Sequence, residues 1–101
     1  MDNSELVKAL DNAAKAERTV KDLASLINVF PDDEEEFRPS TAKVTQIITD
    51  LEAALLVWVN AQALAVELGK SSDAPAAKHL QPADTQRYQD QIASVKAIYQ
   101  M

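Results

Sequence analysis

The chain opens with a run in which apolar residues recur at alternating intervals of three and four positions. In an α-helix this spacing places the side chains in one stripe along a single face. The run covers residues 4–30 and consists of Leu6, Ala9, Ala13, Ala16, Val20, Leu23, Ile27 and Phe30. It predicts a first helix over about residues 4–30, which ends before Pro31 because the residue preceding a proline is disfavoured in helical geometry.

A second run with the same spacing predicts a longer central helix over about residues 40–68. Its stripe consists of Val44, Ile47, Leu51, Ala54, Trp58, Ala61, Ala65 and Leu68. Ser40 is expected to cap its N-terminus, and Gly69 is expected to follow its C-terminus with a positive φ. Because the two stripes share one period and a short connection joins them, they predict an antiparallel helical hairpin. In this hairpin Trp58 falls near the small side chains of Ala13 and Ala16.

The central helix is apolar over more of its circumference than one neighbouring helix requires. Residues 53–66, AALLVWVNAQALAV, carry no charge and lie between Glu52 and Glu67. A second apolar row beside the stripe consists of Ile48, Leu55, Val59 and Val66, and the arc is widened by Val57 and Leu64. Leu56 falls outside this arc. The excess face is covered either by a third helix of the same chain or by a second copy or another protein, with Leu55, Leu56, Val59 and Val66 as candidate contact residues.

A third, shorter helix is predicted over about residues 82–100, where a narrow stripe consists of Tyr88, Ile92, Val95, Ile98 and Tyr99. Residues 69–81 read as a linker with turn-forming residues. The chain has one glycine among 101 residues, which is few for the tight turns of a sheet protein. The expected fold class is therefore all-α. We expect a single domain over residues 1–101, a long antiparallel hairpin with a shorter third helix in a three-helix bundle that can dimerise into a larger helical bundle.

The connection between the first two helices, residues 31–39 (PDDEEEFRP), is strongly acidic. It contains five consecutive carboxylates, namely Asp32, Asp33, Glu34, Glu35 and Glu36, in a chain whose net charge is −6. One interpretation is a solvated turn between helices. The other is a recognition loop for a basic protein partner. A calcium loop is not favoured, because the run lacks the spaced ligands and the glycine of such a site.

The residues that carry common catalytic chemistry are scarce. The chain has no cysteine, and its one histidine, His79, lies in the linker with Pro82 three positions later. We find no glycine-rich phosphate loop and no Glu-x-x-His pair for a metal site in a helical bundle. No cluster of lysine and arginine indicates nucleic-acid binding. We therefore expect a protein that is not an enzyme and that needs no cofactor or metal.

The uncharged run does not predict a membrane span. Fourteen residues of helix extend over about 21 Å, whereas the hydrocarbon core of a bilayer is about 30 Å thick. The polar N-terminus lacks the pattern of a secretion signal, so we expect a cytoplasmic protein.

Two hypotheses for function follow from these patterns. The first is a non-catalytic helical interaction or assembly protein that acts through helix packing as a homodimer, because the central helix has a wide apolar face beside a short third helix. The alternative is a small acidic inhibitor, such as an immunity, antitoxin or phage-type anti-defence protein, which blocks a basic site on a partner through residues 32–36.

Overall fold

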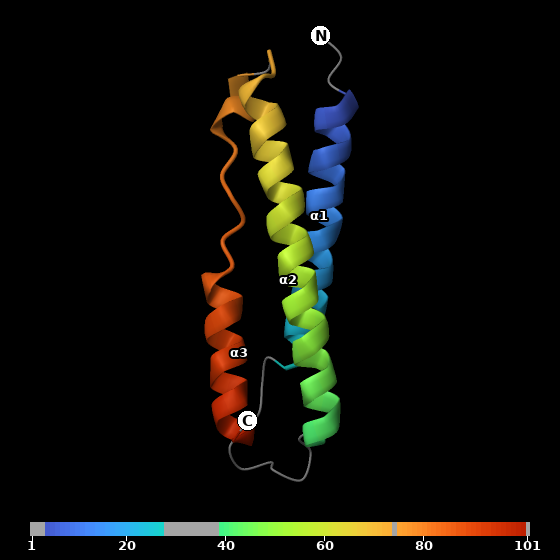
Figure 1. The fold of residues 1–101 in the computed structure, drawn as a ribbon, viewed down its shortest axis with the longest axis vertical. Coiled ribbons are helices and arrows are strands. Elements are labelled where there is room, and N and C mark those ends of the chain that lie inside the picture. Colours follow the sequence, from blue (N-terminus) through green and yellow to red (C-terminus); the bar gives the residue numbers. More distant parts are fainter. Residues whose placement is uncertain (1–3, 28–38, 74, 101) are drawn as a thin grey trace.

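The protein is a bundle of two long helices and one shorter helix (Figure 1). The computed structural model describes residues 4–27, 39–73 and 75–100. Within these ranges the elements are α1 (Ser4–Ser25), α2 (Thr41–Lys70), the 3-10 helix η2 (Pro75–His79) and α3 (Gln86–Tyr99). They form a rod of 57 × 18 × 18 Å, and the described residues contain no strand. The all-α class and the arrangement of a hairpin with a third helix, both predicted from the sequence, are confirmed.

The hairpin of α1 and α2 contains the core, and its two ends differ in the size of the buried side chains. The largest fully buried side chains lie toward the end at which the chain passes from α1 to α2, and they are Ile27, Leu51, Val20 and Val44. Toward the open end the buried residues of α1 are Leu6, Ala9 and Ala13, and α2 contributes Ala65. Trp58 is 7% exposed and belongs to the same core cluster as Ala16, as predicted. The small residues of α1 therefore leave room for the indole and for close approach of the two helices.

The third helix covers only the lower half of the hairpin. Tyr88 of α3 makes an edge-to-face contact with Trp58 of α2, in which the ring centres are 5.9 Å apart and the interplanar angle is 81°. Two hydrogen bonds also hold α3 in place, from Gln91 Nε2 to the carbonyl oxygen of Ala24 (2.9 Å) and from Tyr99 Oη to that of Pro39 (2.8 Å). Above α3, an extended connection follows the upper half of α2 (Figure 1).

Two helix boundaries differ from the sequence-based prediction. Regular α1 ends at Ser25, and the chain tightens into a turn in which Leu26 N and Ile27 N donate to the carbonyl oxygens three residues earlier. The rest of the predicted end, residues 28–30, lies outside the described residues. Helix α3 begins at Gln86 rather than at residue 82. The amides of Tyr88 and Gln89 donate to the carbonyl oxygen of Thr85, which makes Thr85 the residue that precedes the first turn.

The cap predicted at Ser40 is confirmed, whereas the prediction for Gly69 is wrong. Ser40 Oγ accepts a hydrogen bond from Lys43 N at 3.2 Å. Gly69 does not follow the helix with positive φ; it lies inside α2, which continues to Lys70. A Cβ atom at Gly69 would overlap the carbonyl oxygen of Ala77 and lie 3.1 Å from Leu80 Cδ1. Glycine is required here because η2 approaches the α2 backbone closely.

Replacing Gly69 by alanine should therefore lower the free energy of unfolding by about 1–3 kcal/mol, the usual cost of forcing an added methyl group into a filled site. Helix propensity alone predicts the opposite sign, a gain of about 1 kcal/mol. Urea denaturation followed by circular dichroism separates the two. A variant more stable than the wild type would show that η2 does not lie against Gly69.

Candidate interaction surface

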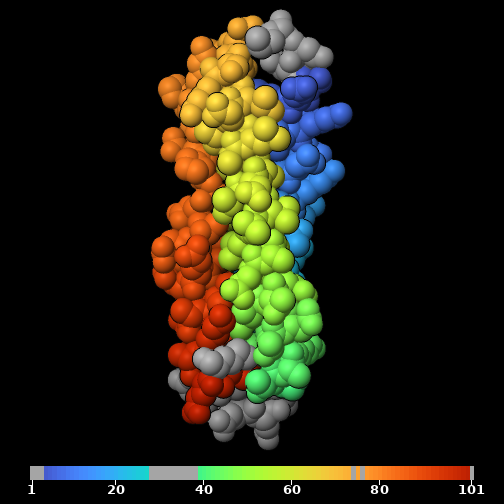
Figure 2. Space-filling view, viewed as in Figure 1, coloured from blue at the N-terminus to red at the C-terminus, as the bar shows by residue number. Residues whose placement is uncertain are grey.

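The solvent-exposed side of α2 is apolar along its middle. We define the outer face of α2 by six exposed residues within about a third of the helix circumference: Ala53, Leu56, Val57, Asn60, Ala63 and Leu64. Leu56, Val57 and Leu64 are 62%, 58% and 54% exposed. Figure 2 shows α2, coloured green to yellow, open to solvent along its length between α1 and α3. Single exposed leucines are ordinary on protein surfaces, but a connected row of apolar side chains without a charge indicates a contact surface.

This face is broader than the sequence indicated. Leu56 was expected outside the apolar arc, and it is 62% exposed. Val57 and Leu64 were expected to widen the apolar arc, for which either the third helix or a partner was the expected cover, and both are more than half exposed in the single chain. The reason is the number of neighbours: α1 and α3 cover one side of α2, and no element among the described residues lies over the other.

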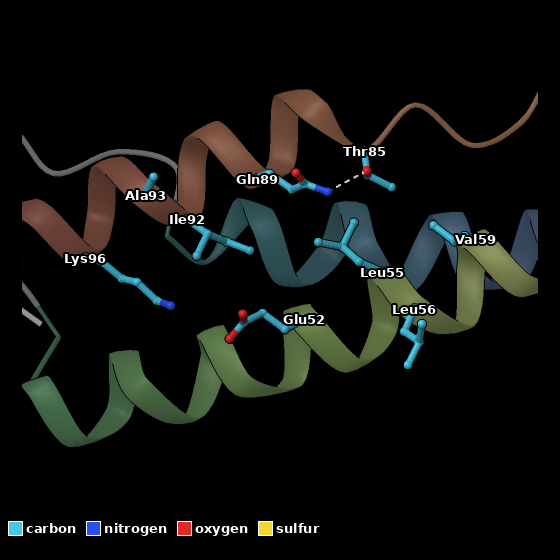
Figure 3. A pocket seen from close by; sticks show the side chains of 9 residues that line it. All are labelled: Glu52, Leu55, Leu56, Val59, Thr85, Gln89, Ile92, Ala93 and Lys96. Carbon is cyan, nitrogen blue, oxygen red and sulfur yellow. Dashed lines mark hydrogen bonds between the residues drawn. The ribbon is translucent and has the colours of Figure 1, made fainter.

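An open groove of about 510 Å³ adjoins this face, between α2 and α3. Its apolar walls are formed by Leu55, Leu56 and Val59 of α2 and by Ile92 and Ala93 of α3 (Figure 3). Leu55 is buried at 7% exposure, whereas Val59 is 38% exposed. Because Leu56 belongs to both, the groove and the outer face of α2 form one continuous apolar surface.

The rim of the groove carries polar groups of both charge signs. Glu52 and Lys96 lie on opposite walls, and Lys96 points across the groove toward Glu52 (Figure 3). On the α3 side, Gln89 Nε2 donates to Thr85 Oγ1 at 2.8 Å, so this amide is held against its own helix. An apolar floor with a rim of charged and amide groups is the usual anatomy of a protein interface.

The candidate residues named from the sequence are thus only partly brought together. Leu55, Leu56 and Val59 line one groove, whereas Val66 is half-buried and lies outside it. The groove also uses Ile92 and Ala93 of α3, which the sequence did not single out as contact residues. The acidic residues Asp32, Asp33, Glu34, Glu35 and Glu36 lie outside the described residues, so their role stays a prediction.

Trp58 has an unusual polar atom. Its Nε1 is buried and has no hydrogen-bond partner among the described residues. Buried donors in proteins are nearly always paired, and an unpaired one costs stability. The indole therefore holds its position by packing, notably against Tyr88, rather than by hydrogen bonding.

Two further cavities, of about 260 and 370 Å³, are smaller than the groove and have a more polar lining. Both are lined by Lys21, Arg87 and Tyr88. The guanidinium of Arg87 lies 5.7 Å from the centre of the Tyr88 ring, so this cation interacts with an aromatic ring of its own helix. Within residues 4–27, 39–73 and 75–100, no three side chains of His, Asp or Glu lie together as metal ligands would.

Judged by length and composition alone, α2 is long and apolar enough to cross a membrane. Only 22% of its most apolar 18-residue window is buried in the protein. Core helices of soluble proteins pass the same comparison, although they are mostly buried. The low buried fraction shows again that α2 has more apolar surface than its own chain covers.

Comparison with known proteins adds no relative: no family model, curated protein or solved structure matches the chain.

Proposed function

We propose that the protein is a non-catalytic helical interaction protein that docks onto a partner helix through the outer face of α2 and the adjoining groove, and that it associates with itself. The observation that carries the proposal is the row of exposed apolar side chains on α2, uncharged from residue 53 to residue 66. A helix that is apolar on all sides is normally buried on all sides.

The energetics favour a partner on this face. Covering the exposed part of one leucine or valine side chain contributes on the order of 1 kcal/mol. Leu56, Val57 and Leu64 are all more than half exposed, so their contributions add along one helix. A partner helix is a suitable occupant, because a straight row of side chains at helical spacing fits between the side chains of another helix.

The groove between α2 and α3 adds depth to the contact surface, so that side chains of a partner can be inserted as well as laid against it. Its apolar walls can receive side chains of the partner beside Leu56, while the charged rim at Glu52 and Lys96 stays in water. Contacts that combine a desolvated apolar centre with a solvated rim are the ones that contribute most to binding.

The test is the mass of the purified wild-type protein in solution. Light scattering at tens of micromolar should give twice the chain mass of 11.1 kDa, with a shift toward 11.1 kDa on dilution. High salt should leave this mass unchanged, since apolar contacts are not screened by ions. A protein that stays at 11.1 kDa at every concentration would contradict self-association.

A further inference from the structure

We infer that the partner on the outer face of α2 is the α2 helix of a second copy, docked antiparallel about a two-fold axis that passes next to Asn60. The inference rests on the proposed function and adds to it the identity, orientation and register of the partner helix. It is carried by a self-complementary arrangement of exposed residues on the two sides of Asn60.

A two-fold axis imposes a simple rule on two antiparallel helices. Residues that face each other across the contact have numbers that add to a constant, here about 120, and they lie on the same edge of the contact face. Two residues of one helix share an edge when they are separated by a whole number of turns, about 7 or 18 residues.

The apolar residues of the outer face satisfy the rule on both edges. Val57 and Leu64 are two turns apart, so they share one edge, and Val57 of one copy meets Leu64 of the other. Leu56 and Ala63 are also two turns apart, on the opposite edge, and pair in the same way. In both pairs each side chain is exposed in the single chain and covered in the pair.

The charges that flank this apolar centre are complementary in the same register. Glu52 and Lys70 are five turns apart, so they share an edge, and the two-fold axis places Glu52 of one copy near Lys70 of the other. The pairing occurs twice, once at each end of the contact. A parallel arrangement in register would instead leave Glu52 of one copy about 27 Å along the helix axis from Lys70 of the other, so that the two charges would not pair.

Glu67 lies on the same side of α2 as the outer face, about one turn beyond Leu64, and the register accommodates it. Its side chain is 75% exposed and its carboxylate lies 3.6 Å from Lys70 Nζ. The two-fold axis places it opposite Ala53 of the other copy, whose small side chain leaves space for the carboxylate to reach solvent.

Asn60 lies where the axis passes and is the polar residue of the outer face. Its carboxamide has both donor and acceptor atoms, so two copies related by the axis can form a reciprocal pair of hydrogen bonds. A single asparagine in an otherwise apolar helix contact is known to fix register and orientation at some cost in stability. A lipid surface would gain nothing from this symmetry, which favours a second copy as the occupant.

The absence of cysteine from the chain allows the register to be tested by single cysteine variants of the full-length protein. Asn60→Cys should form a disulfide-linked dimer under mild oxidation, because the axis places residue 60 next to itself. Val57→Cys and Leu64→Cys should crosslink with each other when mixed. Alone they should crosslink about tenfold less, because their symmetry mates lie about 9 and 12 Å apart along the helix, whereas a disulfide needs Cα atoms within about 7 Å. Val7→Cys, equally exposed on α1, controls for random crosslinking.

The outcomes separate the inference from the proposed function. Efficient self-crosslinking of Val57→Cys and of Leu64→Cys alone would indicate a parallel pair and overturn the inference, while the proposed function stands. A wild-type dimer that gives none of these crosslinks above the Val7→Cys control would overturn it too. A wild type that is monomeric by light scattering, or that floats with vesicles of phosphatidylcholine and phosphatidylglycerol, would overturn both, the latter in favour of a lipid surface.

Discussion

Replacing Leu56 by glutamate should convert the dimer into monomers, weakening self-association by about 100-fold or more. Leu56 belongs both to the outer face of α2 and to the groove, so a partner helix covers it from two sides. A carboxylate there must lose its water without gaining a counter-charge, at a cost of about 3 kcal/mol or more per contact. Light scattering across a dilution series measures the change directly.

The matched control is Val7→Glu on α1. Val7 is 61% exposed and Leu56 is 62% exposed, so the two variants introduce the same charge at equally open apolar positions. Val7 lies in the N-terminal part of α1, where a carboxylate is tolerated by the helix dipole. We expect this variant to keep the wild-type mass. If Leu56→Glu also kept it, the outer face of α2 would not be the contact surface.

Neither variant should disturb the fold of the single chain. Substitutions at exposed positions usually change stability by no more than about 0.5 kcal/mol. Denaturation at a concentration below the dimer dissociation constant should therefore give the same midpoint for both variants and the wild type. A destabilised Leu56→Glu chain would indicate that Leu56 supports the α2–α3 packing instead of a partner.

The two apolar stripes of α1 and α2 were the part of the fold that could be predicted from the sequence. Alternating intervals of three and four depend only on helix geometry, so the burial of Leu6, Val20, Val44 and Leu51 follows from residue type and position alone. The N-cap at Ser40 is likewise local, since its hydrogen bond reaches only Lys43. Features set by neighbouring residues along the chain could thus be predicted.

Features set by distant segments could not. The exposure of Val57 and Leu64 depends on which side of α2 the other helices cover, and α1 and α3 both lie on the opposite side. Gly69 was given the commonest role of a glycine near a helix end, yet its position is explained by Ala77, a contact between two elements. The apolar arc was visible in the sequence, but which part of it remains uncovered required the arrangement of all three helices.

Trp58 is the side chain that joins these three helices, and its replacement should have the largest effect on stability. It packs in one cluster with Ala16 of α1 and makes an edge-to-face contact with Tyr88 of α3. Truncation to alanine should lower the free energy of unfolding by about 3–5 kcal/mol, the usual range for a buried aromatic residue. A loss below about 1 kcal/mol would show that the residue is not part of the core.

Trp58→Phe distinguishes packing from hydrogen bonding at the same position. Phenylalanine keeps an aromatic ring against Tyr88 and removes the buried Nε1–H, which has no partner among the described residues. Removing an unpaired buried donor recovers about 1–3 kcal/mol of desolvation cost, which offsets much of the lost volume. We therefore expect a net loss near 1 kcal/mol, far less than that of Trp58→Ala. Circular dichroism must follow the unfolding, because Trp58 is the only tryptophan and fluorescence is lost with it. If phenylalanine were as damaging as alanine, the indole nitrogen would have a partner after all, and its position would be set by a hydrogen bond as well as by packing.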